Sequence, residues 1–174
     1  MSDIFDKVVG EEDALKKLIA KIPLFKGYIE RGDRRMSDKI LRETVANELE
    51  SQYQRISSVQ RDLISQGGLA LIDDLEGAAI KIRQFIDRVR TASYGYAGLF
   101  DAIKIKEDDL AQVYQYDLEL LGLSEGVSHA IDNVEASIGS DGLPAAIKNL
   151  TTTAQSCLDT FNKRSDVMKD IAAK

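Results

Sequence analysis

The sequence has no tryptophan, two prolines, one cysteine and one histidine among its 174 residues. The scarcity of proline, together with abundant Ala, Leu, Ile, Glu, Lys and Arg, favours an all-α chain. A lone Cys157 excludes an intramolecular disulfide. A lone His129 cannot supply the two Glu-x-x-His motifs of a ferritin-like di-iron centre, and the sequence has no Cys/His cluster typical of zinc sites. We therefore expect neither a metal site nor a cofactor.

Two further absences bear on location and partners. No apolar run approaches the roughly 18–20 residues of a membrane span. Asp3 and Asp6 stand where a signal peptide would carry bases, so we expect a cytoplasmic protein. The formal net charge of −6 gives no overall attraction to polyanions, so we expect no nucleic-acid partner.

Four long stretches carry apolar residues at alternating steps of three and four, the pattern of helices that pack nearly antiparallel. Asp33 is a suitable N-cap for the first helix, and Gly67-Gly68 is a suitable stop. Short glycine turns separate the first helix from the second and the third from the fourth. We therefore predict an up-down-up-down four-helix bundle without a sheet. The expected helices are residues 33–66, 70–91, 107–138 and 144–172.

The first 30 residues form a separate unit in this prediction, and residues 31–174 form the bundle. Leu15, Leu18 and Ile22 recur at helical spacing before Pro23, which ends the helix and leads into a connector at residues 24–28. Two interpretations are open. The helix covers an apolar patch of the bundle, which we favour, or it docks on a membrane surface or a partner.

Charged residues are predicted to meet inside one end of the bundle, which we call the open end. The two glycine turns lie at the other end, the turn end. The first helix brings Arg35, Asp38 and Arg42 to the open end, the third brings Asp117 and the fourth brings Arg164. Unpaired buried charges cost several kcal/mol each, so these charges must pair or face water. We favour a structural ion-pair network; the alternative is a pocket whose arginines bind an anionic ligand or a partner's carboxylate.

The stretch Tyr94-Gly-Tyr-Ala-Gly-Leu-Phe-Asp101 interrupts the helical pattern with aromatics and glycines. Its glycines permit backbone turns that other residues resist, so Tyr94, Tyr96 and Phe100 can be aimed at defined places. With Tyr114 they are expected to roof the charged cluster. Aromatic and arginine side chains are enriched at binding hot spots. This loop is therefore predicted to be ordered and to form a binding face, or alternatively to plug the end of the core.

The loop is expected to pack near Tyr28 and Arg34, beside a rim of basic residues at the open end. Such a rim suits anionic lipid, nucleic acid or an acidic partner, although solvated helix faces with neighbour pairing are the simpler interpretation. The rim comprises Arg31, Arg34, Arg35, Lys39, Lys81, Arg83, Arg88 and Arg90.

Three stretches resemble an uncharacterised family of small helical prokaryotic proteins: Arg34-Arg-Met-Ser-Asp-Lys-Ile-Leu-Arg42, residues 94–101 and Tyr116-Asp117. The resemblance covers most of residues 22–121. It implies no assigned activity and no catalytic residue. Members of that family are often encoded near band-7 (stomatin-like, membrane-scaffold) proteins and zinc-ribbon proteins, which implies an accessory role in a membrane-associated assembly.

Two functions follow as hypotheses. The first is a non-enzymatic interaction module that presents the open end to an unknown protein partner, with peripheral membrane association or oligomer formation as further options. The second is an anion-binding or small-molecule-binding protein, or an enzyme, that uses the arginines and Asp117 under the aromatic loop. We expect no catalytic residue, and the candidate binding residues are Arg34, Arg35, Arg42, Tyr94, Tyr96, Phe100, Asp101, Asp117 and Arg164.

Overall fold

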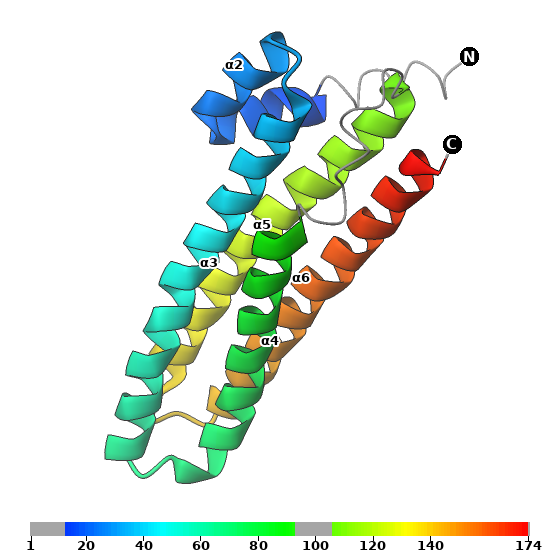
Figure 1. The fold of residues 1–174 in the computed structure, drawn as a ribbon. Coiled ribbons are helices and arrows are strands. Elements are labelled where there is room, and N and C mark those ends of the chain that lie inside the picture. Colours follow the sequence, from blue (N-terminus) through cyan, green and yellow to red (C-terminus); the bar gives the residue numbers. More distant parts are fainter. Residues whose placement is uncertain (1–12, 93–105, 174) are drawn as a thin grey trace, which may run out of the picture.

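The computed structural model describes residues 13–92 and 106–173. Every regular element in these two ranges is helical, which confirms the all-α prediction (Figure 1). Residues 13–21 are helical, and the short helix α2 covers Pro23–Glu30. The long helices are α3 (Arg34–Ser65), α4 (Ile72–Thr91), α5 (Glu107–Ser137) and α6 (Leu143–Ala172), and a 3₁₀ turn, η1 (Leu69–Leu71), precedes α4.

Helix α3 begins and ends as its sequence predicts. The side chain of Asp33 accepts a hydrogen bond from the backbone N–H of Met36 at 3.1 Å, so Asp33 is its N-cap. After Ser65 the chain turns through Gly67, whose φ of +80° is strained for residues with a side chain. The N–H of Gly68 then donates to the carbonyl of Leu63 at 2.8 Å, which satisfies a carbonyl of the last turn.

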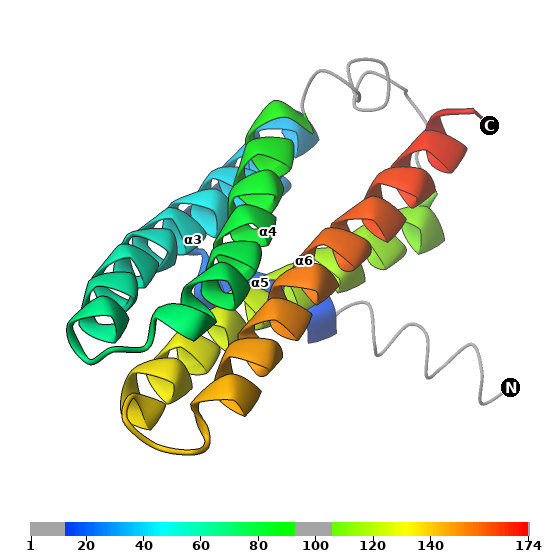
Figure 2. The same ribbon diagram turned by 90° about the horizontal axis from the view of Figure 1, so that it is seen from below.

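The four long helices lie side by side around a shared main core. Helix α3 packs on α4 and α5, and α6 also packs on α4 and α5. The turn between α3 and α4 and the turn between α5 and α6 lie at the same end of the molecule (Figures 1 and 2). Helix α3 contributes Val45, Leu49, Ile56, Val59 and Leu63 to this core, among other buried residues.

Helix α4 is shorter than its neighbours, with 20 residues against 32 in α3, 31 in α5 and 30 in α6. At ~1.5 Å per residue it is about 15 Å shorter than they are. All four helices are present at the turn end, whereas α4 stops before α3, α5 and α6 reach the open end (Figure 1). Beyond the end of α4, only α3, α5 and α6 continue toward the open end. Charged side chains gather at the level where α4 ends.

The prediction of a connector at residues 24–28 is wrong, because these residues belong to helix α2. Pro23 occupies the first turn of α2, where its fixed φ and missing N–H suit a helix start. Phe25 on this helix is buried and meets Tyr114 of α5 edge to face, with ring centroids 6.2 Å apart. Leu18 and Ile22 join the same core as the long helices, so the segment covers an apolar patch, as we favoured.

Candidate functional site

The predicted meeting of charges inside the open end is present as a cluster of four residues, which we call the buried quartet. Asp38 and Arg42 come from α3, Asp117 comes from α5 and Arg164 comes from α6. All four side chains are buried. Three helices far apart in sequence thus meet through charged groups at the level where α4 ends.

Arg164 is the centre of the quartet. Its Nε donates to Oδ1 of Asp117 at 2.5 Å, and its Nη2 donates to Oδ1 of Asp38 at 2.6 Å. Its Nη1 contacts the sulfur of Met168 at 2.9 Å. One guanidinium therefore ties α6 to both α5 and α3. The ion-pair network that we favoured is therefore present, with Asp117 paired to Arg164.

Arg42 completes the quartet and binds the end of α4. Its Nε donates to Oδ2 of Asp38 at 2.8 Å, and its Nη1 donates to the backbone carbonyl of Val89 at 3.1 Å. Carbonyls in the last turn of a helix lack intrahelical donors and carry the negative end of the helix dipole. Arg42 supplies both a donor and a positive charge there, so it stabilises α4 where that helix stops.

The quartet contains two cations and two anions and is balanced overall. Burial raises the pKa of Asp117 to about 6, while the adjacent Arg164 lowers it. Burial lowers the pKa of Arg164, but the nearby carboxylates of Asp117 and Asp38 raise it by more. The pKa of Arg164 therefore lies above its ordinary value. At neutral pH both partners are therefore charged, and the attraction between them offsets much of the cost of burial.

Little space remains beside the quartet. The cavity there measures about 20 Å³, and its lining includes Phe25, Arg34, Ser37 and Tyr114. That volume holds roughly one water molecule. Every buried side-chain nitrogen and oxygen in the described ranges has a hydrogen-bond partner. Within those ranges the quartet is therefore a filled network and not an enclosed ligand pocket.

The prediction that Arg35 faces the interior is wrong, because its side chain is exposed on α3. The interior side of the first turn of α3 instead carries Ser37, which is buried, and Arg34, which is half-buried. The physical reason is that α2 packs on α3 there, and Phe25 and Tyr114 lie on the side of Arg34 and Ser37. A single helical pattern contains no information about such a neighbour.

The aromatic part of the predicted binding face lies outside the described residues. This concerns Tyr94, Tyr96, Phe100 and Asp101, so their roof over the cluster and their contact with Tyr28 and Arg34 stay predictions.

A wide groove follows the outer side of α3 next to the end of α4, and we call it the α3–α4 groove. Its volume is about 620 Å³. Four of its lining residues are cationic and one is acidic: Arg35, Lys39, Arg42, Glu43, Asn47 and Arg90. It contains part of the predicted basic rim. The sequence indicated the basic residues but not that they border one concave surface.

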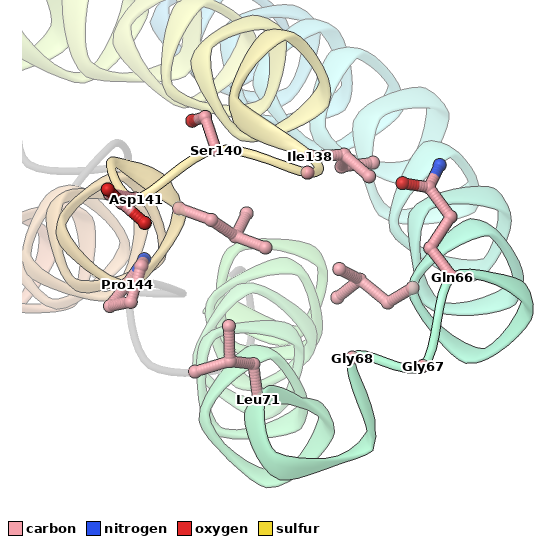
Figure 3. A pocket seen from close by; sticks show the side chains of 11 residues that line it. Gln66, Gly67, Gly68, Leu71, Ile138, Ser140, Asp141 and Pro144 are labelled. Carbon is pink, nitrogen blue, oxygen red and sulfur yellow. The ribbon is translucent and has the colours of Figure 1, made fainter.

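Sequence reasoning did not identify the hollow of about 330 Å³ between the two turns at the turn end (Figure 3). Leu71 points from the end of η1 into the space between the turns (Figure 3). The hollow is at the lower limit of ligand-pocket volumes, roughly 300–1,000 Å³. The only available signal was that both glycine turns were predicted at one end. Its lining also includes Leu63, Gln66, Ile138, Ser140, Asp141 and Leu143.

Other kinds of site have no support in the described ranges. Within them, no group of three or more His, Cys, Asp or Glu side chains is placed to hold a metal ion. None of the helices described has both the length and the apolar character needed to cross a membrane. No protein-family model, curated protein sequence or solved structure matches the chain. Function must therefore be inferred from the surfaces and the quartet themselves.

Proposed function

We propose that this protein is a non-enzymatic interaction module, an up-down-up-down four-helix bundle that presents its open end to a protein partner. One observation carries the proposal: the charged groups at the open end satisfy one another and leave about 20 Å³ of space. Residues that would serve as an interior binding site instead join three helices. Recognition is then a property of the outer surface.

The alternative was an anion or small-molecule site built on Arg42, Asp117 and Arg164. Pockets for such ligands measure roughly 300–1,000 Å³, at least ten times the cavity beside the quartet. A ligand anion would also compete with Asp38 and Asp117 for donors that they already occupy. The described residues therefore favour a structural role for the quartet.

The proposal sets the module in the cytoplasm as an accessory part of a membrane-associated assembly, as the family resemblance implies. The burial of Leu18, Ile22 and Phe25 supports attachment through a partner and not through lipid. A helix that binds a membrane surface needs an exposed apolar face, and here that face packs on the bundle.

Photo-crosslinking in an extract of the source cells tests the proposal. A photoreactive residue is placed singly at Lys26 in α2, Lys39 in α3 or Lys169 in α6, which sample three sides of the open end; all three side chains are exposed. Asp141, in the turn between α5 and α6, provides the control position. We expect at least one open-end position, and not Asp141, to form an adduct with one defined protein. Adducts at Asp141 alone would contradict the proposal.

A further inference from the structure

The α3–α4 groove concentrates positive charge on a protein with a net charge of −6. Four lining residues follow one another at four-residue intervals and form a stripe along one side of α3: Arg35, Lys39, Glu43 and Asn47. Arg90 lies across from them, near the end of α4. The acidic surface lies elsewhere, because residues 107–147 contain no lysine or arginine.

Two arginines of the groove, Arg90 and Arg42, are held in place by their neighbours. Arg90 donates to Glu50 at 2.9 Å and to Asn47 at 3.3 Å. Glu50 is shared with Arg83, whose Nη1 lies 3.0 Å from it and whose Nε lies 3.5 Å from Asp87. Arg42 is held from behind by Asp38 and the carbonyl of Val89. Guanidinium groups that are already oriented lose less entropy when they bind a ligand.

Lys39 is the adaptable cation of the groove. Its Nζ lies 3.8 Å from Glu43, and both side chains are more than half exposed. An exposed pair at that distance contributes little to stability. Lys39 can therefore exchange Glu43 for another carboxylate at low cost.

We propose that the α3–α4 groove binds an acidic polypeptide segment of the partner protein. The carboxylates of this segment pair with Arg35, Lys39 and Arg90. The proposal rests on the proposed function as an interaction module and names the chemistry of the partner. Positions four apart on a helix are about 6 Å apart along its axis. Carboxylates on successive turns of an acidic helical segment have the same spacing. A row of such carboxylates therefore matches the spacing of the stripe on α3.

The composition of the groove favours polypeptide carboxylates over two other polyanions. A membrane surface is bound by cations together with apolar side chains that enter the lipid, and the groove lining contains no apolar residue. Nucleic acid presents a phosphate about every 3.4 Å along each strand, a closer spacing than the roughly 6 Å between successive side chains of the stripe. Arginine forks bind carboxylates with two parallel hydrogen bonds, and Asn47 offers a further polar contact.

A fluorescent poly-glutamate peptide is the probe for this site, with fluorescence anisotropy as the readout. We expect saturable binding to the full chain that weakens as salt is added, because the contacts are electrostatic. The double variant Arg35→Glu/Lys39→Glu should bind about tenfold more weakly or worse. The control variant Arg61→Glu/Lys148→Glu changes the net charge equally at exposed positions near the turn end and should bind like the wild type.

Circular dichroism verifies that each variant is folded. If the double variant does not fold, the single variant Lys39→Glu, at an exposed position, replaces it. Equal loss in groove and control variants would overturn the proposal, since binding would then follow net charge alone. Tighter, groove-dependent binding of anionic lipid vesicles or single-stranded DNA than of poly-glutamate would also overturn it. Cross-linking at Lys26 or Lys169 without Lys39 would refute the groove and leave the interaction module standing.

Discussion

Arg164 is the residue on which the interior of the open end depends. Its side chain is 1% exposed, yet it carries a full charge and contacts residues of α3, α5 and α6. A buried cation of this kind is stable only while its partners remain, because water cannot replace them. Asp117 is the partner whose removal tests this dependence most directly.

Asp117→Ala should lower the free energy of unfolding by about 3–5 kcal/mol, because it removes the acceptor of Arg164 Nε and leaves a buried charge underpaired. Urea unfolding followed by circular dichroism measures the loss. Asp132→Ala is the matched control on the same helix, since Asp132 pairs with Arg55 at the surface. The free energy of unfolding should fall much less in Asp132→Ala than in Asp117→Ala. Equal losses would show that the quartet contributes no more than a surface pair.

The raised pKa of Asp117 predicts a pH dependence. Burial raises this pKa from 3.8 to about 6, so the folded state binds the proton more tightly than the unfolded state. The stability contributed by proton binding at Asp117 is therefore largest below pH 4 and is lost as pH rises through 6, by about 3 kcal/mol in total. Asp117→Asn keeps the shape and an acceptor but cannot titrate. Acidification from pH 7 to 4 should stabilise the wild type relative to this variant, and a constant difference would contradict the assignment.

The N-terminal segment, residues 13–30, contributes buried apolar side chains to the main core. Leu18 is 0% exposed, whereas Leu24, six residues later on α2, is 70% exposed. The segment therefore has one apolar face directed into the core and leaves one large apolar side chain in solvent. These two leucines provide an internal comparison.

Leu18→Ala should destabilise the protein by about 2–5 kcal/mol, since a buried leucine loses both its transfer free energy and its packing. Leu24→Ala should change stability little, because its side chain is exposed. Thermal melting of the two variants checks the difference. If Leu18→Ala melts like the wild type, the segment does not cover the bundle.

The turn between α3 and α4 depends on one glycine conformation. Gly67 has a φ of +80°, so Gly67→Ala should cost about 1 kcal/mol or more. Gly77 lies within α4, and a Cβ added there would meet no described atom within 4 Å. Gly77→Ala should therefore stabilise the protein by up to about 1 kcal/mol. Chemical denaturation of both variants measures these opposite signs.

The described part of the molecule has a main core, to which all the long helices and residues 13–30 contribute, and a small second cluster around Val113 and Met168. Cys157 lies inside it, and burial raises the pKa of its thiol to about 12. It is a small core residue, and it reports on opening of the whole molecule.

Cys157 should react with an aromatic disulfide reagent only when the molecule unfolds, because the reactive thiolate is suppressed and covered in the native state. The labelling rate should therefore rise in step with destabilisation in Asp117→Ala and Leu18→Ala. Absorbance of the released thiolate measures the rate. Rapid labelling of the native wild type would show that the core around Cys157 opens locally.

The long helices and the levels of their charges were determined by the sequence alone. The spacing of apolar residues, an N-cap such as Asp33 and a stop such as Gly67-Gly68 are local features. Their effect on the helix does not depend on residues distant in sequence. Asp117 and Arg164 could be placed together because each lies at a similar distance from a predicted helix end.

Only the tertiary structure decided which side of the first turn of α3 is interior, because that depends on α2 and α5. The same contacts leave Arg35 exposed and bury Ser37, and residues 24–28 belong to the separate helix α2. The α3–α4 groove likewise exists because Arg90 of one helix lies across from a stripe on another. Such surfaces join segments distant in sequence, and no local pattern specifies their relative position.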